Sequence, residues 1–283
     1  MPNTATITKA SALLSPDLKT AQRVATELAR PDTVTPFQRR VERYITPDPT
    51  CRNYLRSLQN GPMVFRGGID LYRRRDDFGQ VFVVQAGWLI GYTRSPENTR
   101  HIYRIYQPGD MVGVEDMNWN YHSANVETVT PAVLTAFPKS ALHEIFEESP
   151  RLARTLFSMT MMDQVQCFDQ LRAMSRMSAE QKVASLLLQL RARSEGAKLL
   201  DDPSVLPLPL TQTHIGDTVG LTNVSVSRAM SQLADAGLIE KGSGHIRFLD
   251  REAITTACDF TDRYTNIDTS WVGTPAGTRA AEG

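Results

Sequence analysis

Short apolar runs and turn-forming residues alternate through the middle of the chain. From about residue 62 to residue 138, runs rich in β-branched and aromatic residues, such as QVFVVQAGWLIGYTR and RHIYRIYQPGD, are separated by Gly, Pro, Asn and Asp. The stretch SPENT, residues 95–99, has the length of a hairpin connection between two such runs. This spacing predicts a strand domain built as a barrel or a double-sheet roll.

After residue 148 the apolar residues recur with the period of an α-helix instead. Ser149 suits an N-cap and Pro150 suits the first helical position, so we expect one long helix over residues 149–177. Its apolar positions form two stripes at helical spacing. The first stripe contains Leu152, Leu156, Met159, Met162 and Val165, and the second contains Phe157, Met161, Phe168 and Leu171.

Two apolar sides on one helix indicate two packing partners. We expect one side to cover the strand domain and the other to meet the same helix of a second subunit. Burial of the whole helix within one chain is the alternative. The positions assigned to self-association are Leu152, Leu156, Met159, Met162, Val165 and Phe168.

The two ends of the chain differ from the rest in amino-acid composition. Residues 1–34 are rich in Thr, Ser, Ala and Pro, and the closing GTPAGTRAAEG is small and polar, so we expect neither end to pack into a core. Thr35 as cap and Pro36 in the first turn begin a short helix in TPFQRRVERYI. The expected parts are a flexible segment (1–34), the strand domain (35–148), the long helix (149–177), a C-terminal domain (178–255) and a tail (256–283).

The C-terminal domain contains two short helical patterns joined by a tight turn. Thr211 can cap the first helix, Gly216 permits a neighbouring helix to approach closely, and Gly220 stands where a left-handed residue must end the first helix. Thr222 or Asn223 can cap the second helix. This spacing is typical of a helix-turn-helix.

The second helix has an apolar side and a short polar side. The apolar side contains Val226, Met230 and Leu233, with Leu238 just past the helix end. The polar side contains Asn223, Ser227, Arg228 and Ser231. Such a helix fits a DNA major groove about 12 Å wide, where an Arg can form two hydrogen bonds with guanine. The following IEKGSGHIRF predicts two short strands, a wing that can touch phosphates.

We therefore expect this domain to bind DNA through its two helices, their caps and the wing. The expected contact residues are Thr211, Thr213, Thr222, Asn223, Val224, Ser225, Ser227, Arg228, Ser231, Lys241 and His245. The alternative is a ligand sensor whose winged domain acts only through protein contacts. Steep weakening of binding with salt separates DNA binding from that alternative.

Charge limits how DNA binding can work. The chain has 31 Lys and Arg residues against 31 Asp and Glu residues, so no overall positive charge favours nucleic acid. Residues 180–252 hold eight basic and nine acidic residues. DNA binding should therefore depend on a focused patch and on doubling of that patch in a dimer.

Other composition signals exclude several classes of protein. Cys51, Cys167 and Cys258 are far apart and lack the spacing of a zinc site or a redox pair, which fits a reducing cytoplasm. The chain shows no signal-peptide pattern and no apolar run near the roughly 18 residues of a membrane span. It also lacks a Gly-rich phosphate loop, a nucleophile elbow, a His-Glu-x-x-His motif and paired carboxylates, so the sequence does not predict an enzyme.

These features together resemble the Crp/Fnr superfamily of bacterial transcription regulators over residues 55–255. The specific part is the helix-turn-helix, where SVSR looks like the family's Ser-Arg pair and carries its base-reading role to Ser227 and Arg228. QPGDMVGVEDM and AEQKVASLLLQL are similar to segments of the family's β-roll and of the helix that opens its DNA-binding domain. The resemblance implies an α+β fold: an N-terminal β-roll like that of cyclic-nucleotide-binding domains, a long dimerisation helix and a C-terminal winged helix-turn-helix. It also implies a homodimer on a near-palindromic promoter site, with RNA polymerase as a further partner.

Two departures from the family pattern concern what the protein binds. Val224 stands where Fnr-type members carry a Glu, and it cannot accept a hydrogen bond from cytosine, so the DNA half-site is open. In the β-roll, Gly113-Val114 and His122-Ser123 replace the Gly-Glu and Arg-Ser segments that hold a cyclic nucleotide. We therefore do not expect cyclic AMP or cyclic GMP as a ligand.

No metal or resident cofactor is expected. With only Cys51 near the N-terminus, the four-cysteine iron-sulfur site of oxygen-sensing members is excluded. Haem or a small-molecule effector stays an alternative, with His101, His122 and His143 as candidate axial ligands. Aromatic candidates for a ligand pocket, for which a plain core is the default, are Trp88, Tyr103, Trp119 and Tyr121. The sequence does not encode the signal or the choice between activation and repression.

Overall fold

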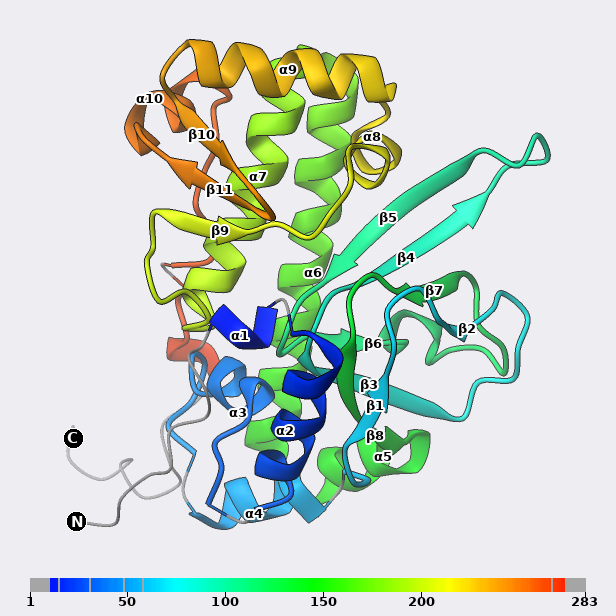
Figure 1. Ribbon diagram of the computed structural model, residues 1–283. Coiled ribbons are helices and arrows are strands. Elements are labelled where there is room, and N and C mark those ends of the chain that lie inside the picture. The colour runs from blue at the N-terminus through cyan, green and yellow to red at the C-terminus, as the bar shows by residue number, and fades with distance from the viewer. Residues whose placement is uncertain are drawn as a thin grey trace.

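In the computed structural model, the chain folds into an N-terminal helical segment, a β-roll, a long central helix and a C-terminal winged domain (Figure 1). The structure describes residues 11–14, 16–30, 32–47, 49–57, 59–265 and 267–272. In the view of Figure 1 the winged domain lies at the top and the β-roll lies below it, with the long helix beside both. The expected α+β architecture is confirmed.

Two antiparallel four-stranded sheets form the β-roll. The first sheet has the order β1-β8-β3-β6 and contains β1 (Met63–Phe65), β3 (Gln80–Ala86), β6 (Met111–Val112) and β8 (Ala132–Pro138). The second has the order β2-β7-β4-β5 and contains β2 (Asp70–Tyr72), β4 (Leu89–Arg94), β5 (Arg100–Tyr106) and β7 (Asn125–Thr128). Val84, Leu89 and Leu134 are among the side chains of both sheets that share one buried core. Residues 95–99 form the expected hairpin connection between β4 and β5.

The N-terminal segment packs on the rest of the chain, so the expectation that residues 1–34 are flexible is wrong for their described part. α1 (Ser11–Leu14) and α2 (Leu18–Leu28) bury Leu13 and Val24 completely. The core cluster that holds them also contains residues of the β-roll and of the winged domain. The many polar residues of this segment suggested flexibility. The apolar residues of α2 nevertheless recur at helical spacing among Thr, Arg and Glu, and they form its buried side.

Two further helices connect this segment to the β-roll. α3 (Pro36–Val41) begins as expected, with a capping box in which Thr35 Oγ1 accepts from the Gln38 N–H at 3.1 Å and Gln38 Oε1 accepts from the Thr35 N–H at 2.9 Å. α4 (Pro49–Ser57) follows. Phe37 of α3 lies in a core cluster with residues of β3.

The long helix α6 (Pro150–Arg176) follows α5 (Lys139–Glu148) after a single residue, Ser149. Ser149 is the N-cap residue of α6 and Pro150 follows it in the first turn, as predicted, but the Ser149 side chain makes no capping hydrogen bond. Its backbone instead belongs to both helices, since its N–H donates to the Ile145 carbonyl and closes α5.

α6 buries one of its two apolar stripes within the chain. The residues that lie in a core cluster with α3, β3 and α5 are Leu152, Leu156 and Met159. Their assignment to self-association is therefore wrong. Met162 and Val165 are half-buried, and Phe168 is exposed. Periodicity revealed two stripes but could not tell which of them the β-roll covers.

The winged domain surrounds a three-stranded sheet of order β10-β11-β9. Its elements are α7 (Ala179–Gly196), β9 (Val205–Pro207), α8 (Gln212–Val219), α9 (Asn223–Asp235), β10 (Ile239–Gly242), β11 (His245–Phe248) and α10 (Arg251–Ala257). Antiparallel β10 and β11 form the expected wing. β9 pairs with β11 and was not predicted, because it lies in a Pro-rich connection.

The segment after α10 also packs on the chain, so the expectation of a tail without a core is wrong for its described part. Tyr264 is buried, and Val272 of the short helix η2 (Ser270–Val272) is completely buried. Single apolar residues in a polar stretch form no period, so the sequence pattern could not show this packing. Residues 1–10 and 273–283, also expected to be flexible, lie outside the described residues.

Five charged side chains, three of them buried and two half-buried, form a group that we call the junction cluster: Arg40, Asp110 and Arg193, with Arg104 and Asp163. Asp110, in the turn before β6, pairs with Arg40 of α3 and Arg193 of α7. Asp163 of α6 pairs with Arg40 at 3.1 Å and with Arg104 of β5 at 2.8 Å. Burial by itself would raise the pKa of Asp163, but Arg104 and Arg40 outweigh it and hold that pKa below its usual value. The cluster joins the β-roll, the long helix and the winged domain.

Asp110→Asn should strongly destabilise the protein. It leaves Arg40 and Arg193 buried with one carboxylate fewer, and removing one partner of a buried pair costs about 3 to 5 kcal/mol. The free energy of unfolding from urea denaturation measures this loss. Glu147→Gln replaces an exposed acid and serves as the control, with little change expected. Equal stability of the two variants would show that the junction cluster does not hold the fold together.

Candidate nucleic-acid interface

Backbone features that the sequence specifies hold the two helices of the helix-turn-helix together. Gly220 ends α8 in the left-handed conformation, with φ of 69°, and its N–H donates to the Gly216 carbonyl. A Cβ at Gly216 would lie 2.4 Å from the Leu221 carbonyl oxygen, so only glycine fits there. Both glycines therefore do what the sequence predicted, and α9 follows α8 after a tight turn.

Threonine hydroxyls cap both helices. Thr211 Oγ1 accepts from the His214 N–H at 3.2 Å, and Thr222 Oγ1 accepts from the Ser225 N–H at 3.2 Å. Thr222, rather than Asn223, is therefore the cap of α9. The Thr211 hydroxyl proton stays available for another acceptor, because its oxygen accepts the capping bond. The Thr222 hydroxyl also lies 3.0 Å from Ser225 Oγ, so one of these two hydroxyls donates to the other.

α9 lies at the end of the molecule away from the β-roll and presents its polar side to solvent (Figure 1). The inward residues are Val226, Met230 and Leu233, all buried as predicted. The outward residues are Asn223, Val224, Ser227 and Arg228, all exposed. Val224 is 71% exposed, which places an aliphatic side chain among polar ones. The outward side is thus available to a partner.

The positive charge of Arg228 acts on Glu180, which also hydrogen-bonds with Gln232, and sequence reasoning missed both of these residues. Glu180 accepts a hydrogen bond from Ser178 Oγ at 2.7 Å. That bond first, and then its own N–H, Gln232 and Arg228, hold the pKa of Glu180 below its usual value. Glu180 belongs to α7 and Arg228 to α9, so no local pattern could have paired them. Glu180 thus adds a negative charge near the Arg228 guanidinium.

The remaining predicted residues gather around two contacts. Asn223 Nδ2 donates to Thr213 Oγ1 at 3.1 Å, which links α9 to α8. Lys241 Nζ of the wing donates to Ser231 Oγ of α9 at 3.2 Å. His245 is half-buried, with its Nδ1 3.2 Å from the Ser243 carbonyl oxygen, so its ring folds back on the wing. The structure thus brings α8, α9 and the wing to one surface.

In the β-roll, an internal carboxylate occupies the segment that replaces the phosphate-binding residues of cyclic-nucleotide binders. Asp116 Oδ1 accepts from the Ser123 N–H at 3.0 Å, and Asp116 Oδ2 lies 2.9 Å from His122 Nδ1. The His122 ring stacks on Tyr72 with ring centroids 3.4 Å apart, and Phe78 meets it edge-on at 5.2 Å. A phosphate would have to displace Asp116 from both of these nitrogens.

The other ligand candidates are dispersed. His101 and His143 are exposed, whereas His122 is buried against Asp116. The aromatic candidates are equally scattered, with Trp88 in the core, Tyr103 bonded to Glu115, and Trp119 and Tyr121 exposed. Within the described part of the chain, no three His, Cys, Asp or Glu side chains gather into a possible metal site. No helix among the described residues is long and apolar enough to span a membrane.

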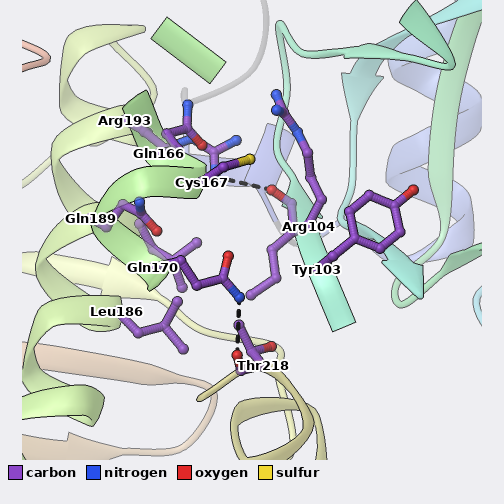
Figure 2. Close-up of a pocket in the computed structure, with 11 residues that line it drawn as sticks. Tyr103, Arg104, Gln166, Cys167, Gln170, Leu186, Gln189, Arg193 and Thr218 are labelled. Carbon is purple, nitrogen blue, oxygen red and sulfur yellow. Dashed lines mark hydrogen bonds between the residues drawn. The ribbon is translucent and has the colours of Figure 1, made fainter. Parts of the chain in front are cut away.

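A small pocket lies where the β-roll, α6 and the winged domain meet (Figure 2). Arg104, Cys167 and Arg193 are among the residues that line it. Its free space of about 20 Å³ suits about one water molecule and is too small for an organic effector. Gln170 Nε2 of α6 donates to the Thr218 carbonyl of α8 at 3.0 Å (Figure 2). The long helix and the winged domain are therefore hydrogen-bonded to each other beside this pocket.

The β4–β5 hairpin also holds the first helix of the helix-turn-helix. Arg100 Nε lies 2.7 Å from Asp217 Oδ2 of α8, and both side chains are largely buried. Burial first, and the Arg100 charge second, lower the pKa of His214 in the same helix. The β-roll and α6 together therefore position α8, and the tight turn at Gly220 places α9 relative to it.

Comparison with known proteins matches both the β-roll and the winged domain. The profile of the Crp-like helix-turn-helix domain matches residues 181–256, and that of the cyclic nucleotide-binding domain matches residues 62–149. The nitrogen fixation regulation protein FixK of Bradyrhizobium diazoefficiens is 29% identical over 66% of this chain and 77% of its own length. The transcriptional activator protein anr of Pseudomonas aeruginosa is 24% identical over 69% of this chain and 76% of its own length.

A solved structure agrees with these matches. FixK2 from Bradyrhizobium japonicum aligns with a TM-score of 0.62 and 25% identity, covering 69% of this chain and 96% of that chain. The two domain profiles, the regulator relatives and the helix-turn-helix geometry all point to one family. The chain belongs to the Crp/Fnr family of transcription regulators, and its relatives are consistent with the Fnr-like branch.

Proposed function

We propose that this protein is a homodimeric, sequence-specific DNA-binding regulator of transcription that acts on a near-palindromic promoter site. The observation that carries the proposal is the exposed polar side of α9, held by the caps and the glycine turn of a helix-turn-helix. FixK and anr are themselves a regulation protein and a transcriptional activator. In this proposal the protein acts in the bacterial cytoplasm, where it meets DNA and RNA polymerase. The proposed function gives no residue a catalytic role.

α9 supplies the groups that read base edges in the major groove. Arg228 can donate two hydrogen bonds to O6 and N7 of guanine, and Asn223 and Ser227 support it from the same side. Val224 cannot accept a hydrogen bond from cytosine, but its exposed methyl groups fit beside the methyl group of thymine. The half-site should therefore contain a guanine opposite Arg228 and a thymine next to Val224.

Phosphate contacts fix α9 in the groove. The N-termini of α8 and α9 offer hydroxyl protons and backbone N–H groups, which favour an anion. The residues that position phosphates are Thr211, Thr213, Thr222 and Ser225, joined by Ser231 and Lys241 where the wing meets α9. His245 contributes least, because its ring folds back on the wing.

Ion pairs keep several acidic side chains of the winged domain away from DNA. The pairs are Asp217 with Arg100, Glu195 with Arg191, and Asp202 with Arg247. The first of these brings a positive charge from the β-roll to α8. Arg100 thereby offsets the excess of one acidic residue in this domain, while Glu180 stays near Arg228.

The exposed side of α6 has the spacing of a coiled coil. We call it the α6 seam, and its members follow one another at intervals of four and three residues: Phe157, Met161, Gln164, Phe168, Leu171 and Ser175. Its four apolar members are about half to two-thirds exposed, a large apolar surface for a chain in water. The four-three alternation is the heptad pattern by which identical helices pack, so a second copy completes the seam. Such a pair presents two α9 helices to successive major grooves.

Arg228→Ala should weaken binding to a selected DNA duplex by about 1 to 3 kcal/mol and relax the preference at one base pair. The loss comes from two hydrogen bonds to guanine, because Arg228 is exposed and outside the core. Fluorescence anisotropy on the selected duplex and on single-base variants measures both effects. Arg23→Ala removes an exposed Arg of α2 and should bind like the original protein. Unchanged affinity and preference in Arg228→Ala would remove Arg228 from base reading.

Replacing Phe168 and Leu171 together by Ala should weaken the dimer by about tenfold or more. Both residues are exposed in the single chain and would be covered at the centre of the seam, and each change occurs twice in a two-fold dimer. Sedimentation velocity over a dilution series gives the dissociation constant. Phe146→Ala removes an exposed aromatic of α5 outside the seam and should leave that constant unchanged. A double variant that dimerises as tightly as the original chain would place the interface elsewhere.

A further inference from the structure

The chain continues past α10 in a segment that neither family profile covers. We call residues 259–265 and 267–272 the C-terminal strap. In Figure 1 the strap leaves α10 and runs in orange to red toward the β-roll end of the molecule. It brings residues that follow the winged domain back toward the beginning of the long helix.

Polar contacts at three levels of α6 anchor the strap. They pair Arg172 Nη1 with Asp259 Oδ2 at 2.8 Å, Asp169 Oδ2 with Arg263 Nε at 3.5 Å, and Arg154 Nε with the Val272 carbonyl oxygen at 2.9 Å. As the strap advances, its partners move back along α6, so it runs antiparallel to the helix. From residue 172 to residue 154 the helix axis covers about 27 Å, at 1.5 Å per residue. The strap is therefore fixed along most of α6.

Two strap residues are also buried. Tyr264 lies beside Arg193 of the junction cluster, and burial raises the pKa of its phenol to about 12 even though Arg193 opposes that shift. Val272 lies in the core cluster that contains Leu152 and Leu156 of α6. The middle and the end of the strap are thus parts of the folded core.

Trp271 stands next to buried Val272 but remains exposed. Its ring meets the Phe157 ring edge to face, with ring centroids 6.4 Å apart and an interplanar angle of 87°. Trp271 is 46% exposed and Phe157 is 57% exposed. Because Phe157 is the first member of the α6 seam, Trp271 extends the apolar surface of the seam by one large side chain.

We propose that the C-terminal strap is a dimerisation element in which Trp271 packs against α6 of a second copy, beside Phe157. This proposal rests on the homodimer of the proposed function. A second copy is the occupant because Trp271 is continuous with a seam whose heptad spacing matches an identical helix. In a two-fold pair the Phe157 side chains approach the axis, and each Trp271 flanks the opposite helix. Tryptophan is among the residues that contribute most to interfaces when covered.

Trp271→Ala in the full chain should raise the dissociation constant of the dimer by about tenfold or more. Sedimentation velocity over a dilution series measures this change, and circular dichroism verifies that the chain stays folded. The matched control is Trp119→Ala, which removes a tryptophan of the β-roll that is 45% exposed and far from α6 in sequence. The control should dimerise like the original chain.

Tryptophan fluorescence gives a second readout, because Trp271 is one of only three tryptophans and becomes covered in the dimer. On dilution, the emission of the original chain and of Trp119→Ala should shift to longer wavelength, whereas Trp271→Ala should show no shift. Trp271→Lys adds a charge beside Phe157 and should weaken the dimer further than Trp271→Ala.

These experiments can refute the role of the strap without refuting the homodimer. If Trp271→Ala and Trp271→Lys dimerise like the original chain while the Phe168 and Leu171 double variant does not, the strap is not a dimerisation element and the homodimer stands. If the original chain is monomeric at every concentration and also on DNA, the homodimer itself is wrong, and the role of Trp271 fails with it.

Discussion

Three guanidinium groups and two carboxylates lie together, buried or half-buried, where the β-roll, the long helix and the winged domain meet. Asp110 holds Arg40 and Arg193, and Asp163 holds Arg40 and Arg104, so that each buried charge depends on a partner from another part of the chain. Separating such pairs away from water is costly. These pairs hold the winged domain in its orientation relative to the β-roll, and the rest of the structure depends on that orientation.

The position of the DNA-reading helix follows from this joint through α8. Arg100 of the β-roll holds Asp217, and Gln170 of α6 holds the backbone of Thr218, so two different parts of the chain fix one short helix. The turn at Gly220 then places α9 beside it. The strap adds a second connection from the winged domain to α6. Where α9 points is thus set by the β-roll and by the helix that is proposed to form the dimer.

Local signals account for what the sequence could predict. The roles of Thr211, Gly216 and Gly220 depend on neighbours a few residues away, so the helix-turn-helix was predicted in detail and confirmed. Which stripe of α6 faces the β-roll depends on surfaces that distant segments supply, and periodicity carries no information about them. The same holds for the strap, for the surfaces that cover the apolar side of α2 and for the effect of the Arg228 charge on Glu180. These features belong to tertiary packing rather than to local pattern.

Equilibrium binding to DNA selected from a random pool, measured across a salt series, tests the central claim most directly. A sequence-specific DNA-binding dimer predicts that the logarithm of affinity falls linearly with the logarithm of salt concentration. It also predicts tighter binding to the selected duplex than to a scrambled duplex of the same composition at every salt concentration. Binding that ignores salt, or that is equal for the two duplexes, would contradict the claim and leave a winged domain that acts through protein contacts.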